Sequence, residues 1–195
     1  MRYDKGHKDA THRHILNIAA KLFLKHGIDG VGIATIMKEA GLTNGGFYAH
    51  FKSKDALVAE MLDEILEQKE TEYLSNNPDP LVYIKFYLSP LHRDRIECGC
   101  PISALLSELV HHSKATRKVL TKWSVRTVER IAAQLKGSEE ERNKRALSIM
   151  AILFGSLQMA RAVTDQELSD RILSGAYETA VKLVTGANEA QQPAT

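Results

Sequence analysis

Residues 33–54 read IATIMKEAGLTNGGFYAHFKSK, and this stretch decides the fold. Its apolar side chains fall on one face of a helix over residues 33–40, and Gly41 stands just past the end of that helix. A second, very short helix is predicted to begin after a Thr43 cap and to run to about Phe51. Two short helices joined by a sharp glycine turn indicate a helix-turn-helix, whose second helix enters the major groove of DNA.

The second short helix has two dissimilar faces. Phe47 and Phe51 point the same way and are predicted to anchor it, whereas Gly45, Gly46 and Ala49 form the opposite face. Each glycine costs a helix about 1 kcal/mol relative to alanine, and such local violations tend to mark function. We interpret the bare backbone as a surface that presses against base edges. The alternative is that the two glycines are a turn between packed helices.

Polar side chains flank this face, and the charge of the chain is concentrated near it. Tyr48, His50 and Lys54 are expected to donate to DNA phosphates. Residues 1–54 hold nine Lys and Arg against four acids, a net charge of +5, while the remaining 17 bases and 20 acids give −3. A basic leading segment on a slightly acidic body favours a polyanion bound at one end.

The rest of the chain is predicted to be helical, because helical spacing recurs and strand-like alternation is absent. The first helix stops at Gly27, and Ser53 caps a helix from Lys54 to about Leu74. Further helices are predicted over residues 80–89, 101–112, 115–136, 139–164 and 167–185. The last ten residues, from Gly186 on, are predicted to be a loose tail. The expected fold class is all-α.

Residues 11–60 closely resemble the signature of the TetR family of bacterial repressors. The matching residues are Ile15, Ala19, Ala20, Leu22, Phe23, Gly27, Ile33, Ile36, Ala40, Gly41, Leu42, Thr43, Gly45, Phe47, Tyr48, His50, Phe51, Ser53, Lys54 and Leu57. The resemblance implies a homodimer on a palindromic, double-stranded operator, released from it when a small-molecule inducer enters the larger domain. It also implies a three-helix DNA-binding domain over residues 1–53 and a larger helical ligand-sensing and dimerisation domain over residues 54–195, about nine helices in all.

The family's recognition helix and its flank map onto seven positions of this chain. They are Thr43, Asn44, Gly45, Gly46, Tyr48, His50 and Lys54. Gly46 departs from the family, because other members often carry a base-contacting side chain there, so Asn44 is the best candidate for a hydrogen bond to a base edge. The basic arm of Arg2, Lys5 and Lys8 is a candidate for phosphate or minor-groove contacts, and a plain solvated terminus is the alternative.

Two apolar helices are candidates for the dimer interface. The helix over 139–164 is apolar nearly all round, and the helix over 167–185 carries its own apolar stripe. By resemblance, these two helices pair with their copies in a four-helix bundle. The alternative is that both are core helices of a monomer.

Cys98 and Cys100 form the most unusual local sequence. Pro101 suits the first position of a helix, which makes Cys100 its cap and exposes the thiol to unpaired N–H groups that stabilise a thiolate. One interpretation is a sensor of electrophiles or oxidants, and the other, which we favour, is two small residues in a tight turn. Zinc binding together with His92, His111 and His112 is disfavoured, because the one-residue gap between the cysteines suits tetrahedral geometry poorly.

Aromatic and apolar residues of the later helices are candidates for lining the inducer pocket, although side chains at such spacings are more often core. They are Tyr83, Phe86, Tyr87, Leu105, Leu109, Trp123, Phe154 and Met159. The histidines around the first helix are interpreted as solvated side chains: His7, His12, His14 and His26. No cofactor is indicated.

Two rival functions were weighed against DNA binding. A thiol enzyme would need Cys100 as nucleophile with His111 or His112 as base, and no third group is spaced to orient that base. A helical adaptor leaves the paired glycines and the charge asymmetry unexplained. An enzyme is therefore not expected. The chain opens without a signal peptide, and its most apolar run, 146–163, is interrupted by polar residues such as Arg161, so a cytoplasmic protein without a membrane partner is expected.

Overall fold

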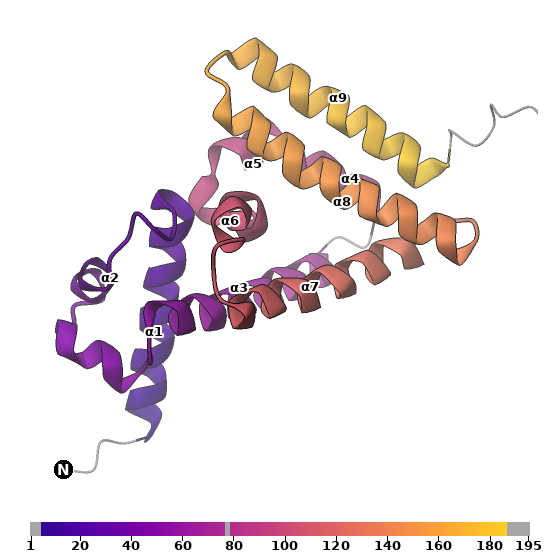
Figure 1. The fold of residues 1–195 in the computed structure, drawn as a ribbon. Helices are drawn as coiled ribbons and strands as arrows, with labels where there is room; N and C mark the ends of the chain where they lie inside the picture. The colour runs from indigo at the N-terminus through magenta and orange to yellow at the C-terminus, as the bar shows by residue number, and fades with distance from the viewer. Residues whose placement is uncertain (1–4, 77–78, 187–195) are drawn as a thin grey trace, which may run out of the picture. The chain divides into compact units, whose positions relative to one another are not determined.

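The computed structural model describes residues 5–76 and 79–186, and the regular structure in these ranges is helical throughout (Figure 1). The all-α prediction is confirmed. The elements are α1 (Lys5–His26), α2 (Ile33–Glu39), the 3₁₀ helix η1 (Asn44–Ala49), α3 (Lys54–Asn76), α4 (Pro80–Tyr87), α5 (Pro90–Asp94), the 3₁₀ helix η2 (Ile96–Cys98), α6 (Pro101–Leu109), α7 (Lys114–Ala133), α8 (Glu139–Ala162) and α9 (Gln166–Thr185).

Side-chain caps explain several of the helix starts. The Ser53 hydroxyl accepts a hydrogen bond from the Ala56 N–H at 3.0 Å, as predicted for the start of α3. The predicted helix over 80–89 is α4, which ends at Tyr87, and the short helix α5, which was not predicted, starts at Pro90 after a Ser89 cap. The predicted tail after Gly186 lies outside the described residues, as do the arm residue Arg2 and the Lys5 side chain.

The chain divides into two compact units, which are described separately. The first comprises residues 1–70 and 96–121, and the second comprises residues 71–95 and 122–195. The predicted domain boundary at residue 53 does not coincide with a boundary between these compact units. It separates the proposed DNA-binding residues from the rest of the chain and stays a prediction. None of the helices in the described ranges is both long enough and apolar enough to cross a membrane.

In the first unit, α1 packs against α2 and α6, and η1 packs against α2. The core contains Ile15, Ala19 and Phe23 of α1, which are fully buried. Leu105 and Leu109 bury the inner face of α6. We call α1, α2 and η1 the head.

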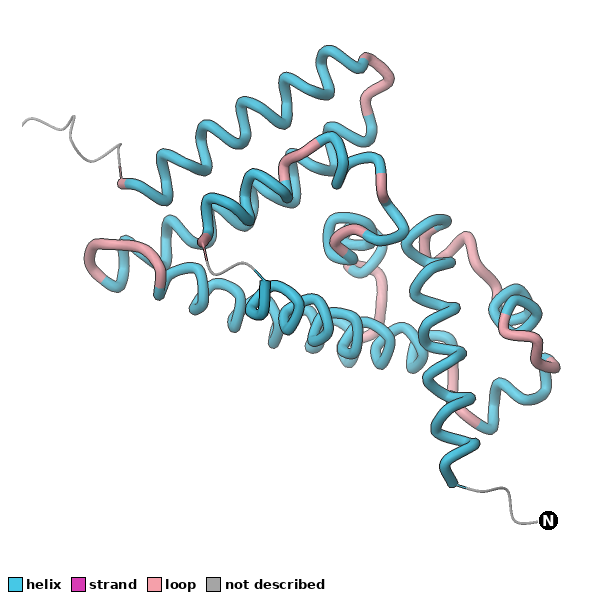
Figure 2. The backbone as a smooth tube through the Cα atoms, turned by 180° about the vertical axis from the view of Figure 1, so that it is seen from behind, coloured by secondary structure: helices cyan, strands magenta, loops and turns pink. Residues whose placement is uncertain are grey.

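In the second unit, α8 and α9 lie side by side and antiparallel, as both backbone views show (Figure 2). Helix α4 packs against α9, and α5 packs against α8. The buried Arg93 fixes α5 to the α8–α9 turn, since its guanidinium donates to Ser169 (2.9 Å) and Asp170 (2.5 Å). Its Nε donates to Asp94 (2.7 Å), and Arg161 donates to the Arg93 carbonyl oxygen (3.1 Å).

The turn after α1 depends on Gly27. Its φ is +77°, a left-handed conformation that side chains rarely adopt, and a Cβ there would lie 2.8 Å from Oε1 of Glu108. The backbone conformation therefore favours glycine at this position, and a Cβ would also displace the end of the Glu108 side chain.

We predict that Gly27→Ala lowers the free energy of unfolding by about 1–3 kcal/mol, because strain and crowding act together. Urea denaturation followed by circular dichroism measures the change. Gly6→Ala is the control, since Gly6 lies in α1 with no heavy atom near its would-be Cβ, and it is expected to be neutral or stabilising. Equal stability of wild type and Gly27→Ala would show that the turn is not constrained in this way.

Candidate nucleic-acid interface

A sharp turn separates α2 from η1. The Gly41 N–H donates to the Lys38 carbonyl (3.0 Å) and the Leu42 N–H donates to the Met37 carbonyl (2.8 Å), with Gly41 at φ +69°. This pair of bonds is the Schellman ending of a helix, which lets the chain change direction within two residues. The predicted glycine turn is confirmed. The Thr43 prediction is wrong in detail, since the Thr43 side chain makes no capping hydrogen bond to η1.

Two buried rings hold η1 against the rest of the head. Phe47 is fully buried, Phe51 is nearly so, and their ring centroids are 5.5 Å apart. The imidazole of His12, on α1, stacks on Phe51 at 4.3 Å. The predicted anchoring by Phe47 and Phe51 is confirmed.

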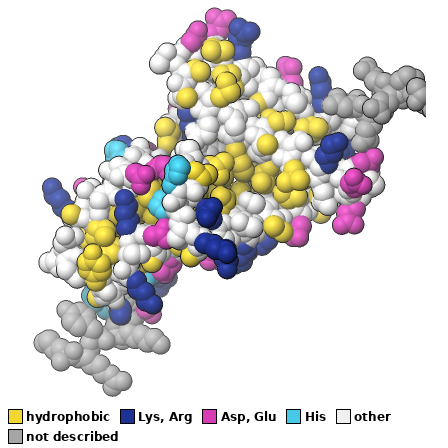
Figure 3. Space-filling view, in the orientation of Figure 1, with side chains coloured by type: hydrophobic (Ala, Val, Ile, Leu, Met, Phe, Trp, Pro, Cys, Tyr) yellow, Lys and Arg dark blue, Asp and Glu magenta, His cyan; other side chains and the backbone are white. Residues whose placement is uncertain are grey.

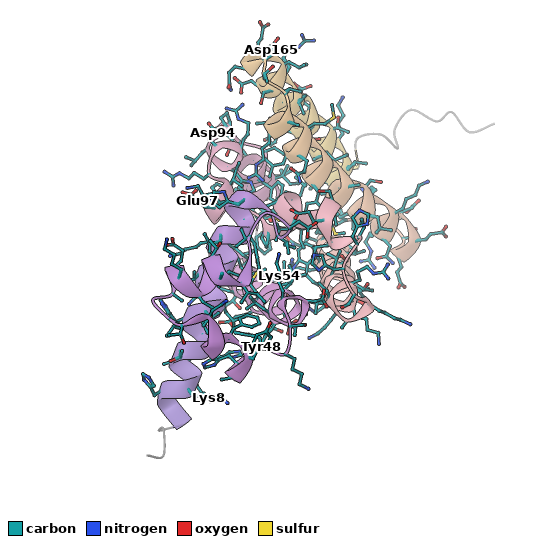
Figure 4. All side chains as sticks on the ribbon, turned by 60° about the vertical axis from the view of Figure 1, so that its left-hand side comes forward. Lys8, Tyr48, Lys54, Asp94, Glu97 and Asp165 are labelled. Carbon is teal, nitrogen blue, oxygen red and sulfur yellow. The ribbon has the colours of Figure 1, made fainter. Side chains whose placement is uncertain are left out.

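The opposite face of η1 is open to solvent. Thr43, Asn44, Gly45 and Ala49 are exposed, and Gly46 is half-buried. Tyr48 is 68% exposed and stands at the outer edge of the head, with Lys8 on the same end of the unit (Figure 4). A large aromatic side chain left this open is available to a partner.

The two glycines of η1 have no internal reason to be glycine. Neither has a positive φ. A Cβ on Gly45 would meet no heavy atom within 4 Å, and one on Gly46 would make ordinary contacts with Met37 (3.6 Å) and Thr43 (3.7 Å). Alanine would fit the fold at both positions, so whatever excludes a side chain there lies outside this chain.

Lys54 is less available than its sequence position suggests. Its Nζ donates to the Ile28 carbonyl at 2.6 Å and lies 5.8 Å from the Phe23 ring centroid, so the ammonium braces the α1–α2 turn. An ammonium has three donors, and a phosphate contact by Lys54 stays a prediction.

The comparisons with known proteins agree with this geometry. The family model described as "Bacterial regulatory proteins, tetR family" matches residues 15–61, which span most of α1 through the first turns of α3. Residues 15–61 of this chain are thus similar to the tetR family of bacterial regulatory proteins.

Among the relatives of this chain is the HTH-type transcriptional regulator AcrR of Shigella flexneri, 34% identical over 43% of this chain and 41% of AcrR. The HTH-type transcriptional repressor NemR of Escherichia coli is 25% identical over 67% of this chain and 69% of NemR. The fold resembles the reduced form of E. coli NemR, with a TM-score of 0.70, 21% identity and coverage of 88% and 95%. It also resembles a TetR-family regulator of Agrobacterium tumefaciens, with a TM-score of 0.71, 22% identity and coverage of 88% and 98%. These relatives are named as regulators, not as enzymes.

His12 is a residue of the family-like head whose role sequence reasoning missed. It was interpreted as solvated, but its Nε2 lies 2.5 Å from Oε1 of Glu60 on α3 while its ring covers Phe51. His12 thus joins α1, α3 and the end of η1. Its partner Glu60 is 48 positions away, so no local pattern signals the contact.

The candidate inducer-pocket residues fall in both units. In the second unit, Tyr83, Tyr87, Phe154 and Trp123 follow one another at ring-centroid separations of 5.7, 6.1 and 5.9 Å. Leu105 and Leu109 are buried within the first unit. The inclusion of Phe86 and Met159 is not supported, because these side chains are 52% and 60% exposed. A ligand-binding role for the others stays a prediction.

The cysteines lie at the start of α6. Cys100 is half-buried, is not in a disulfide, and directly precedes Pro101, but its thiol makes no capping hydrogen bond. Cys98 belongs to η2, and its side chain lies outside the described residues. Within the described ranges, no cluster of His, Cys, Asp and Glu has the arrangement of a metal site.

The rival enzyme site does not assemble. Cys100 precedes the first turn of α6, while His111 and His112 follow its last turn. A nine-residue helix is about 13 Å long, which is too far for hydrogen bonding between nucleophile and base. In addition, Nδ1 of His112 is bound to Asp55 at 2.8 Å.

The environment of His50 makes the head sensitive to acid. Burial lowers the pKa of His50, and the nearby His12 and Lys8 lower it further. Its Nδ1 is enclosed without a hydrogen-bond partner, so a proton added there gains no acceptor. The unfolded chain therefore binds a proton at this residue more readily than the folded chain does.

We predict that His50 contributes stability above its ordinary pKa of 6.5 and that this contribution is lost as the pH falls below that value. Free energies of unfolding at pH values from about 7.5 to about 5.5 should fall more steeply for wild type than for His50→Gln. His26→Gln, at an exposed position of α1, should follow the wild-type profile. Parallel profiles for wild type and His50→Gln would refute the interpretation.

Proposed function

We propose that this chain is a homodimeric, ligand-responsive transcriptional repressor that binds a palindromic operator through η1. The observation that carries the proposal is the pair of glycines whose missing side chains the fold itself does not require, on an exposed face beside Tyr48. Close approach to DNA explains them, because a bare backbone can press against base edges and thymine methyl groups. The similarity of residues 15–61 to the family and the repressors among the relatives support this function.

Operator contacts are assigned by this argument. The exposed Asn44 is the candidate for a base-edge hydrogen bond, and Thr43, Tyr48 and His50 are placed to reach phosphates or base edges around it. Lys8, in the first turns of α1, is the described residue of the basic arm that can add a phosphate contact. The net charge of +5 over residues 1–54 supports an anionic partner at this end.

Exposed apolar side chains on α8 and α9 support the proposed dimer. Leu147, Ala151, Gly155 and Met159 recur every four residues along α8, and all four are exposed. The space-filling view shows that hydrophobic side chains reach the surface in several places (Figure 3). Gly155, and Gly175 on α9, would carry a Cβ into open space. Small residues within an apolar stripe let a second helix approach closely, which favours pairing with a second copy.

A response to electrophiles or oxidants at Cys100 remains a secondary hypothesis about the inducer. A half-buried thiol at the start of a nine-residue helix has unpaired backbone N–H groups nearby. The similar NemR structure is that of a reduced form of that protein. Ordinary ligand binding among the aromatic residues of α4, α7 and α8 is the alternative.

We predict that Gly45→Ala and Gly46→Ala leave the melting temperature unchanged or higher but weaken operator binding roughly tenfold or more, about 1.4 kcal/mol. Tyr48→Ala should also weaken binding, since it removes an exposed donor from η1 without touching the core. Fluorescence anisotropy on a duplex from the region upstream of the gene measures the affinities. Unchanged affinity in all three variants would contradict the proposed role of η1.

We predict that Met159→Glu converts the dimer to a folded monomer with weakened operator binding, because a charge in an apolar interface cannot be buried without a partner. Light scattering after size exclusion measures the mass, and circular dichroism checks the fold. Val125→Glu is the matched control, since Val125 is comparably exposed (52%) but lies on α7. A dimeric Met159→Glu protein would exclude this face as the interface.

A further inference from the structure

Two carboxylates attach the head to the corner between α6 and α7, which we define as residues 108–116. The first is Glu108, in the last turn of α6. Its Oε2 accepts the Asp29 backbone N–H at 2.9 Å, and its carboxylate lies so close to Gly27 that a Cβ there would be 2.8 Å from Oε1 and would displace it. Glu108 therefore holds the turn that connects α1 with α2.

The second carboxylate is Asp55, in the first turn of α3. Its Oδ1 is 2.8 Å from His112 Nδ1, 3.2 Å from Thr116 Oγ1 and 3.4 Å from the Ser113 N–H. Burial alone would raise the pKa of Asp55, but hydrogen bonds from Ser113, His112 and Thr116 outweigh burial and lower it. One carboxylate thus lies at the amino-terminal ends of both α3 and α7, where backbone N–H groups stabilise negative charge.

Lys54 connects the α1–α2 turn, which Glu108 binds, with the start of α3, where Asp55 lies. It directly precedes Asp55 and donates to the Ile28 carbonyl, next to the Asp29 N–H that Glu108 holds. Glu108 of the corner therefore binds the α1–α2 turn, and Lys54 at the start of α3 binds the same turn. Asp55, also in α3, binds the corner. We call these contacts the polar joint.

Hydrogen bonds are directional, whereas apolar packing tolerates sliding and tilting. A head attached through the polar joint is therefore held at a defined angle to the α6–α7 corner. In a dimer, two heads that tilt freely within their own units can reach half-sites over a wider range of separations than two heads that are each held at one angle. Operator half-sites are about 34–36 Å apart, one turn of DNA, and one base pair more or less turns a half-site by about a tenth of a helical turn.

We propose that the polar joint sets the half-site spacing that the dimer recognises, with Asp55 and Glu108 as positioning residues rather than DNA contacts. The inference rests on the proposed function. It predicts that removing either carboxylate loosens the discrimination between operator spacings without changing which bases each half-site requires.

The test measures the affinity of the full-length protein for duplexes whose half-sites are separated by the natural spacing, or by one or two base pairs more or fewer. Wild type should prefer one spacing by about tenfold or more, comparable with the effect of a base mismatch. In Asp55→Ala and Glu108→Ala this preference should fall to about threefold or less. Glu108→Gln, which keeps an acceptor for the Asp29 N–H, should retain the wild-type preference.

Two controls separate positioning from general stability. Glu64→Ala removes an exposed acid of α3 outside the joint and should keep the wild-type spacing preference. Mismatched half-sites at the natural spacing should weaken binding of wild type and joint variants by the same factor. If the alanine variants bind every spacing more weakly by one common factor, or keep the wild-type preference, the inference is overturned. If wild type binds none of the duplexes, the proposed function fails as well.

Discussion

A six-residue 3₁₀ helix with two glycines has little stability of its own, so the shape of η1 has to be imposed from outside. Phe47 and Phe51 impose it. Burying each ring contributes on the order of 2–3 kcal/mol, more than the glycines cost, and the stacked His12 ring closes the site around Phe51. The proposed DNA-binding face of η1 is thus held in place by the rings that pack on the opposite face. The exposed face itself does not have to stabilise the fold.

The segment that begins at residue 96 also supports the head from behind its proposed DNA-binding face. Helix α6 and the start of α7 belong to the compact unit that contains the head, although they lie far along the chain from it. Apolar contacts of α6 hold the unit together, and the hydrogen bonds of the polar joint are proposed to fix the angle of the head. A unit built from two distant segments makes the geometry of the head depend on residues that a boundary at residue 53 assigns to the other domain.

The features that sequence predicted were those with local causes. The stop at Gly27, the turn at Gly41, the cap at Ser53 and the anchoring by Phe47 all follow from neighbours within one or two helical turns. The prediction ended a helix at residue 89 but missed α5, although a serine followed by a proline is a local signal for a helix start.

The features that sequence did not predict depend on contacts between distant segments. Glu108 holds a backbone N–H 79 positions away, and His12 meets a carboxylate 48 positions away. Lys54 shows why the sequence alone is ambiguous. Its position beside η1 suggests a contact with a DNA phosphate, yet its ammonium donates to the Ile28 carbonyl in the α1–α2 turn. Only the fold shows which of the two roles a charged side chain has.

The glycines of this chain differ in whether the fold itself explains them. Gly27 and Gly41 have positive φ angles, so the fold itself explains them. Gly45, Gly155 and Gly175 lie in helices, where glycine is unfavourable, and a Cβ on each would meet nothing within 4 Å. A residue that weakens its own helix and relieves no internal crowding is best explained by something that approaches from outside. For Gly45 the approaching body is proposed to be DNA, and for Gly155 and Gly175 a second copy of the chain. Gly6 of α1 is equally open, so the criterion marks a candidate surface only where other exposed side chains point to a partner, as Tyr48 does beside Gly45 and Met159 does beside Gly155.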